Sequence, residues 1–160
     1  MRSLLESVGG ARRSLRKLLR LPADQRRLLV GTALLLEGIK VAVRLLPFRG
    51  VCRILDWAGR LPRSGDQNPP NCPSVEEISH AVALVSRYTP GTKTCLTQAL
   101  ALRLLLVRRG YPATLRIGVV REGGERLQAH AWVESEGRVV IGGHQLDRYT
   151  PLLDLGGQTA

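Results

Sequence analysis

The chain contains few cysteines and few aromatic residues for its length. Its three cysteines, Cys52, Cys72 and Cys95, are odd in number and form no C-x-x-C pair. This argues against a disulfide framework and against a zinc site, so we expect no metal and a reducing, cytoplasmic setting. Aromatic residues make up 4% of the 160 residues, so the core has to be built mainly from aliphatic side chains.

Motifs that bind nucleotides or nucleic acids are also missing. No G-x-x-x-x-G-K-[ST] loop occurs, and we expect no cofactor. The formal net charge is +11, but the basic residues are not interleaved with aromatic ones, so we expect no nucleic-acid partner. Residues 1–27 hold eight Lys or Arg against two acids. That Leu-rich amphipathic segment suits an acidic partner or an anionic membrane surface, and a solvated basic helix is the plain alternative.

One apolar run, residues 28–46, approaches the length needed to cross a bilayer. Glu37, Lys40 and Arg44 interrupt it, and each costs roughly 2.5 to 3.5 kcal/mol at the centre of a membrane helix. The run therefore predicts a buried or partner-contacting helix. Peripheral membrane contact through residues 1–46 stays open as an alternative.

Helical spacing predicts a further short helix over residues 49–60, after Pro47 ends the preceding one. The stretch 61–73 is rich in proline, glycine and asparagine, which is typical of a linker. We therefore expect a helical N-terminal region, residues 1–70, and a core domain, residues 71–160.

The core is predicted to combine helices with a small antiparallel sheet. Ser74-Val75-Glu76-Glu77 has the form of a capping box, and the helix that it opens should stop before Pro90. Period-two patterns and glycine turns then predict a meander of three strands, over residues 114–120, 128–134 and 138–141. The expected fold class is α+β, with helices packed on one face of the sheet.

A second helix should begin at Cys95. Thr94 is a suitable N-cap, and Gly110 suits a left-handed C-cap, so the helix should end near Arg109. Cys95 then takes the first helical position, where the positive end of the helix dipole favours thiolate over thiol. A lone cysteine in such a place is more often a small buried hydrophobic residue, so the position alone does not establish a nucleophile.

The strand 128–134 carries a candidate base. Period-two geometry puts His130, Trp132 and Glu134 on one face of this strand. If the helix start packs against that face, the imidazole of His130 lies within bonding reach of the Cys95 sulfur and can take its proton. The other histidines, His80 and His144, are expected to be helix-surface and loop residues.

These motifs resemble those of the lasso-peptide leader peptidases. The resemblance lies in the Cys95 helix ending Arg108-Arg109-Gly110-Tyr111-Pro112, the Ala129-His130-Ala131-Trp132-Val133-Glu134 strand, and the closing Tyr149-Thr150-Pro151-Leu152. Such proteins are cysteine proteases with a papain- or transglutaminase-like core, and they remove the leader from a ribosomally made precursor. The resemblance implies that Cys95 is the nucleophile and His130 the general base.

The third catalytic group is less evident. Proteins of this family place an acidic residue on the strand after the histidine, whereas residues 138–144 contain no carboxylate. Our candidate is Asp147, with Asp154 and Glu134 behind it; a backbone carbonyl or Gln145 could serve instead. Glu134 is about 13 Å along the strand from His130, too far for a direct bond.

Two further residues are candidates for contact with the substrate. Gln98 could donate to an oxyanion together with the backbone N–H of Cys95, and Trp132 could shield the site or touch the peptide. A surface position for Gln98 and plain core packing for Trp132 are the alternatives.

The resemblance also implies partners. They are the precursor's leader peptide, a separate leader-binding protein of the recognition-element type, and an ATP-dependent ligase that closes the macrocycle. Cleavage is expected after a leader whose penultimate residue is threonine. A transglutaminase-type acyl transferase and a non-catalytic basic adaptor for a membrane or another protein remain as alternatives.

Overall fold

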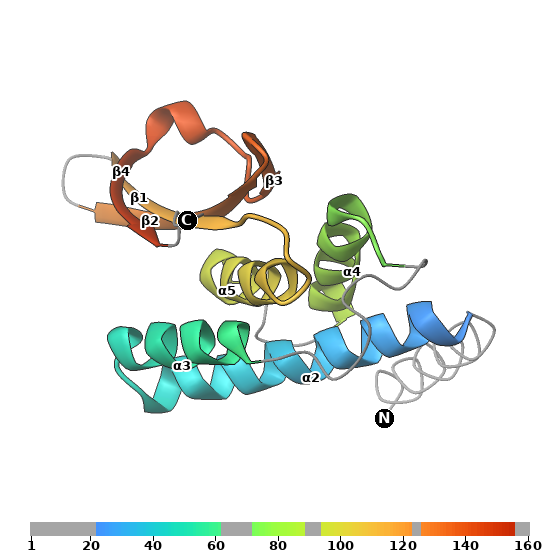
Figure 1. Ribbon diagram of the computed structural model, residues 1–160. Helices are drawn as coiled ribbons and strands as arrows, with labels where there is room; N and C mark the ends of the chain where they lie inside the picture. Colours follow the sequence, from blue (N-terminus) through green and yellow to red (C-terminus); the bar gives the residue numbers. More distant parts are fainter. Residues whose placement is uncertain (1–21, 62–71, 89–93, 123–125, 156–160) are drawn as a thin grey trace, which may run out of the picture.

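The computed structural model describes residues 22–61, 72–88, 94–122 and 126–155. The elements form three tiers (Figure 1): a curved sheet, then helix α5 (Cys95–Val107) with α4 (Val75–Tyr88) beside it, and then the pair α2 (Ala23–Leu45) and α3 (Phe48–Arg60). The arrangement confirms the predicted α+β class.

The sheet has four antiparallel strands in the order β3-β2-β1-β4. They are β1 (Thr114–Glu122), β2 (Arg126–Ser135), β3 (Arg138–Ile141) and β4 (Thr150–Leu155), with a short 3-10 helix, η1 (Leu146–Arg148), before the last. The first three strands confirm the predicted meander. The fourth was not predicted, since it carries Pro151 and lacks alternation; proline is tolerated there because β4 lies at the edge of the sheet.

Both N-terminal helices follow a proline. Pro22 and Pro47 precede α2 and α3, where the missing N–H and the fixed φ of proline suit a helix start. The predicted run 28–46 is helical, but the helix begins five residues earlier, at Ala23. No helix among the described residues has the length and apolar composition required to cross a membrane. Residues 1–21, most of the predicted basic segment, lie outside the described part.

The capping box predicted for α4 is formed. The Ser74 backbone N–H donates to Glu77 Oε2 at 2.8 Å, and the Glu77 N–H donates to Ser74 Oγ at 3.2 Å. Two of the helix's orphan donors are therefore satisfied reciprocally, which fixes where α4 starts.

Helix α5 is buried on nearly all sides and forms the centre of the molecule. Leu100, Leu102 and Leu106 are 1% exposed or less, and they share one apolar core with side chains of α2, α3, α4 and the sheet. Gly110 takes a left-handed φ of 79° after the helix, as predicted for its C-cap. The predicted domain boundary near residue 70 falls in the undescribed stretch 62–71, but helices from both sides of it contribute to this core.

Candidate active site

Cys95 occupies the first position of α5, as the sequence predicted. The N-cap is Thr94, whose hydroxyl oxygen accepts from the Thr97 backbone N–H at 3.4 Å and bonds the Thr97 hydroxyl at 2.6 Å. The cap fixes the direction in which the chain enters the helix, and with it the place of Cys95. The cysteine is half-buried and packs against the aliphatic core.

Cys95 and His130 line the same cavity, which has a volume of about 280 Å³. The other lining residues are all apolar and come from five elements, α2, α3, α5, β1 and β2: Val43, Phe48, Leu96, Ile117, Ala129 and Ala131. Val43 of α2 and Phe48 of α3 were not foreseen as site residues. Their spacing looks like that of ordinary core positions, and only the packing of α2 and α3 beneath the cavity gives them this place.

The imidazole of His130 makes its contacts on the opposite face of the sheet from α5. Its ring centroid lies 5.0 Å from that of Tyr149 and 6.3 Å from that of Trp132. The alternate residues of β2, Ala131 and Val133, belong to the core around α5. Because successive side chains of a strand alternate, His130 points away from that helix. Within the described residues no hydrogen bond joins it to Cys95, so the expected direct contact is not formed.

A backbone carbonyl holds the second nitrogen of this ring. His130 Nε2 lies 2.7 Å from the Gly142 carbonyl oxygen. A carbonyl only accepts, so Nε2 carries the proton and the neutral ring keeps Nδ1 as its free acceptor. This is the tautomer that a base needs if Nδ1 is to take a proton from a thiol.

Gly142 has to be glycine for this bond to form. Its φ is 78°, and a Cβ added there would meet the Ala131 carbonyl oxygen at 2.7 Å and Trp132 Cβ at 2.9 Å. Both the left-handed backbone and the close approach to β2 exclude other side chains. The sequence shows two adjacent glycines after β3, but not which of them would bond the histidine.

The candidates for the third catalytic group lie elsewhere. Asp147 is exposed on η1, and Gln145 is also exposed and accepts from Arg148 Nη1 at 2.8 Å. Glu134 accepts from Trp132 Nε1 at 3.0 Å and from Arg116 Nε at 2.9 Å. The partner of His130 is thus the backbone carbonyl, one of the alternatives that the sequence left open. A catalytic role for Asp147 stays a prediction.

Trp132 is 4% exposed and stacks beside His130, with an angle of 22° between the rings. Its indole N–H donates to Glu134, and Glu134 also pairs with Arg116. The same arginine pairs with Asp154, with 3.2 Å between Nη1 and Oδ2. This network ties β2, β1 and β4 together. Gln98 is half-buried one turn along α5 and, among the described residues, is not part of the cavity lining.

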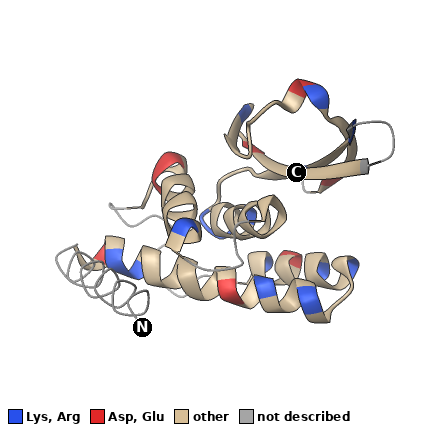
Figure 2. Cartoon of the chain, turned by 180° about the vertical axis from the view of Figure 1, so that it is seen from behind, with Lys and Arg blue, Asp and Glu red and all other residues tan. Residues whose placement is uncertain are grey.

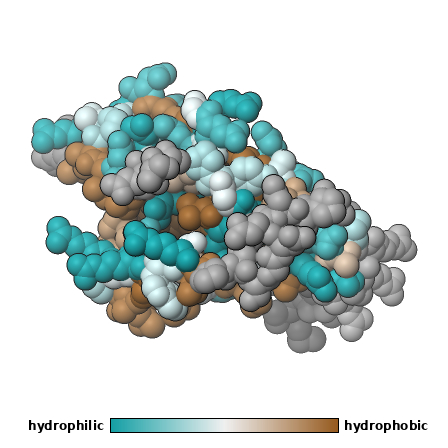
Figure 3. Space-filling model, in the orientation of Figure 1, coloured by the Kyte–Doolittle hydropathy of each residue, from teal (hydrophilic) through white to brown (hydrophobic). Residues whose placement is uncertain are grey.

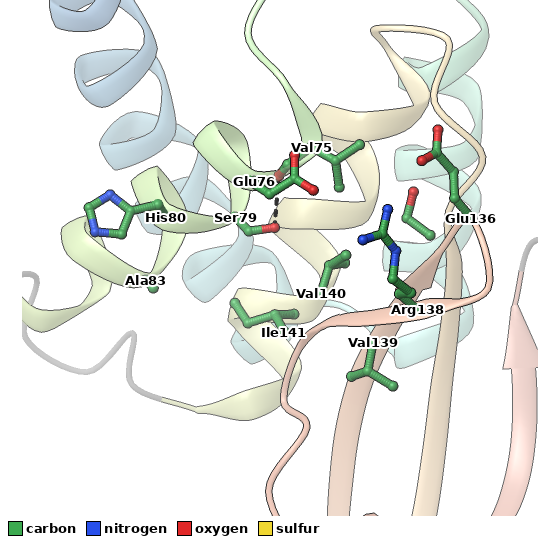
Figure 4. A pocket seen from close by; sticks show the side chains of 11 residues that line it. Val75, Glu76, Ser79, His80, Ala83, Glu136, Arg138, Val139, Val140 and Ile141 are labelled. Carbon is green, nitrogen blue, oxygen red and sulfur yellow. Dashed lines mark hydrogen bonds between the residues drawn. The ribbon is translucent and has the colours of Figure 1, made fainter.

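A larger cleft of about 410 Å³ lies between α4 and β3, away from Cys95 and His130 (Figure 4). Arg138 reaches across it toward Glu76, and His80 lies at its rim. The pKa of Glu76 is below its ordinary value, chiefly because its own backbone N–H and the Ser74 hydroxyl bond its carboxylate, while Arg138 adds a smaller effect. None of the predicted catalytic residues lines this cleft.

The described residues contain no group of three or more His, Cys, Asp or Glu side chains that could hold a metal ion. The residues that line the smaller cavity include one cysteine and one histidine. Such a set is sufficient for nucleophilic acyl transfer, provided that thiol and imidazole meet.

Comparison with known proteins places the chain in a family. Residues 39–154, more than half of the chain, match the model of the transglutaminase-like superfamily, and the protein belongs to it. The matched region starts within α2, on the N-terminal side of the predicted boundary. Membership fits a cysteine peptidase or an acyltransferase. No curated protein and no solved structure gave a significant match.

Proposed function

We propose that the protein is a cysteine peptidase that removes the leader peptide from a ribosomally synthesised lasso-peptide precursor. The observation that carries the proposal is the shared cavity. In a transglutaminase-like chain, Cys95 at the start of a capped helix lines one small space with residue 130 of β2, a histidine whose ring contacts the other face of the sheet. The motifs around both residues support the leader-peptidase specificity.

In the proposed reaction, Cys95 gives its proton to Nδ1 of His130, and the thiolate attacks the scissile carbonyl carbon. The Cys95 backbone N–H donates to the oxyanion that forms. As the tetrahedral intermediate collapses, the C–N bond breaks and His130 returns the proton to the leaving amine. Water then hydrolyses the thioester and restores the thiol.

This mechanism requires the imidazole to reach the cavity side of β2. The ring would leave its contacts with Tyr149 and Trp132, which lie on the face of the sheet opposite α5. Catalytic hydrogen bonds often align fully only in the substrate complex. A strand side chain cannot cross the sheet by rotating about its own bonds, so the backbone of β2 at residue 130 has to turn over locally. We infer that entry of the peptide into the cavity accompanies this change.

The proposal includes a separate leader-binding protein and a downstream ATP-dependent ligase. The elements described over residues 22–61 are helices. We assign recognition of the leader to another protein, acting in the cytoplasm. Residues 1–27 are one candidate docking segment, and unchanged partner affinity and cleavage after their deletion would contradict that part.

The test is to incubate the protein with a candidate precursor and its leader-binding protein, and to identify products by mass spectrometry. Wild type should cleave after the leader, while Cys95→Ala and His130→Ala should each lose about 10³-fold or more in rate. Asp147→Asn tests which group orients the imidazole of His130. Unchanged activity in this variant assigns that role to the Gly142 carbonyl. Cleavage that survives Cys95→Ala would disprove the proposal.

Acyl transfer to an amine is the second candidate, and the apolar lining of the cavity favours it. Val43, Phe48 and Ile117 leave few polar groups to place a hydrolytic water. Adding a primary amine to the same reaction separates the two activities. An amide product in place of the free acid would identify a transferase.

A further inference from the structure

A line of large apolar side chains runs along the solvent side of α2, away from the candidate active site. It consists of Val30, Leu34, Val41 and Leu45, at intervals of four, seven and four residues. Leu34 is 71% exposed and Leu45 76%, and the other two are each 49% exposed. We call this line the outer stripe. It lies opposite the buried positions Thr32, Leu36 and Ile39, so α2 is apolar on two sides.

The adjoining helix extends the same surface. On α3, Ile54 is 49% exposed and Trp57 is 64% exposed. In the space-filling view, apolar side chains line the lower edge of the molecule over α2 and α3, next to a row of hydrophilic ones (Figure 3). Large apolar side chains gathered on an exposed surface often mark a binding face.

The width of the outer stripe indicates what binds there. A helix that lies in a bilayer surface presents a broad apolar face, whereas a seam at heptad spacing fits one partner helix. One seam position, Glu37, is acidic, but it pairs with Lys40 on the same helix. Gly31 and Gly38 flank the stripe seven residues apart, and a Cβ added at either would meet nothing within 4 Å. Their small size allows a partner backbone to approach closely.

The charges around this surface indicate the sign of the partner. Arg49, Arg53 and Arg60 are exposed on α3, and Arg44 is exposed on α2. Figure 2 shows Lys and Arg in bands along both helices. Basic side chains beside an apolar seam favour a partner helix with acidic residues at its flanks, because such pairs set orientation and partner choice.

We propose that the outer stripe, together with Ile54 and Trp57, is the docking face for a single acid-flanked amphipathic helix of a separate protein. That this protein is the leader-binding partner rests on the proposed function; the docking face itself does not. The face lies on α2 and α3, the same helices that supply Val43 and Phe48 to the cavity. A helix bound there would be placed beside the elements that form the cavity floor.

The first experiment uses designed probes in place of the natural partner. One is a fluorescein-labelled peptide of about three heptads with leucine at a and d and glutamate at e and g; the other has lysine at e and g. Fluorescence anisotropy should show the acidic peptide binding at least about tenfold more tightly than the basic one. Equal affinities, or a preference for the basic peptide, would overturn the proposal.

Variants then locate the binding surface. Leu34→Glu should weaken binding of the acidic peptide about tenfold or more, and Trp57→Ala should act in the same direction. The matched control is Leu152→Glu, because Leu152 on β4 is 65% exposed and should leave binding unchanged. All three side chains are mostly exposed, so the thermal midpoints should stay close to that of wild type. Equal loss in the control would overturn the assignment to this face.

Three other occupants of the outer stripe can be told apart from a partner helix: a second copy of the chain, a membrane, and the chain's own N-terminal residues. Light scattering would detect a dimer that Leu34→Glu dissolves, and flotation with vesicles of anionic and neutral lipids would detect a membrane contact sensitive to that change. Deletion of residues 1–21 would reveal a face covered by the chain itself, if peptide binding appears only afterwards. Any of these outcomes replaces the proposal. Failure to cleave a precursor leaves the peptide-binding result intact, so the two hypotheses fail separately.

Discussion

At the scale of single residues, the orientation of His130 depends on a backbone atom. The Gly142 carbonyl bonds Nε2, and aromatic rings of Trp132 and Tyr149 lie beside the imidazole. A carboxylate would also stabilise the protonated ring electrostatically, whereas a carbonyl chiefly fixes its tautomer and direction. The position of this carbonyl is set in turn by a glycine that packs against β2.

Gly142→Ala is therefore expected to damage both the fold and the site. The left-handed φ and the contact of 2.7 Å with a backbone oxygen should together lower the free energy of unfolding by about 2 to 4 kcal/mol. Gly137→Ala is the matched control: its φ is 75°, but an added Cβ meets nothing within 4 Å, so only about 1 kcal/mol should be lost. Urea unfolding measures both, and equal losses would contradict the role of the close approach.

Cys52 should resist alkylation at mildly alkaline pH. Burial raises the pKa of its thiol and Asp56 raises it further, while Arg103 opposes them. A raised pKa leaves less thiolate at pH 8 than an exposed cysteine would have. Iodoacetamide labelling read by peptide mapping should thus be slower at Cys52 in the folded protein than in urea. Asp56→Asn should speed it, and an unchanged rate would argue against the electrostatic contribution.

At the scale of elements, two caps fix where the helices around the sheet begin. Ser74 and Glu77 cap α4 reciprocally, and Thr94 caps α5. Both helices start after stretches that contain proline, so the capping side chain decides the first turn. Only the second cap is next to a candidate catalytic residue.

Replacing either cap should cost similar stability but affect activity differently. Ser74→Ala and Thr94→Ala should each lower the free energy of unfolding by about 1 kcal/mol, because orphan N–H groups lose their acceptor. Peptide cleavage should fall in Thr94→Ala, since Cys95 directly follows the cap, and should be retained in Ser74→Ala. Urea titration and a product assay on the same samples provide the measurement. Equal loss of activity in both variants would contradict a local effect at Cys95.

At the scale of the whole molecule, α5 joins the sheet to the N-terminal helices. Its leucines belong to one core with Leu36 of α2 and Val51 of α3 on one side and Val133 of β2 on the other. Arg103 also bonds Asp56 of α3 at 2.8 Å. The helical region and the sheet should therefore unfold together.

Leu102→Ala tests this cooperativity. The side chain is 0% exposed, so its truncation should lower the free energy of unfolding by about 2 to 5 kcal/mol. In a Trp57→Phe background, Trp132 fluorescence reports on the sheet and far-ultraviolet circular dichroism on the helices. Both transitions should shift by the same amount of urea. Two separated transitions would show independent domains. The control variant is Val107→Ala, at a more exposed position of α5, which should lower the free energy of unfolding by about 1 kcal/mol or less.

The sequence by itself determined most of the local structure. Caps, glycine C-caps and periodicity are signals within about ten residues, and they identified α3, α4, α5, β1, β2 and β3 with small errors at their ends. The Cys95 and His130 motifs likewise indicated the family before any contact was known. Strand β4 was not predicted, because its sequence does not alternate and contains Pro151. It forms because it pairs with β1, some 35 residues away in the chain.

Only the tertiary structure decided how the site residues face one another. The alternation of β2 was visible in the sequence, but which face would pack on α5 was not, because alanines and valine on one face and Trp132 on the other can both be buried. In the structure the small side chains of β2 pack against α5, and His130 lies on the opposite face of the sheet beside Tyr149. The acceptor of its ring proton is a backbone carbonyl, and every residue type carries one. Nothing in the sequence pattern could therefore mark Gly142 for that role, since long-range packing alone brings this atom to the imidazole.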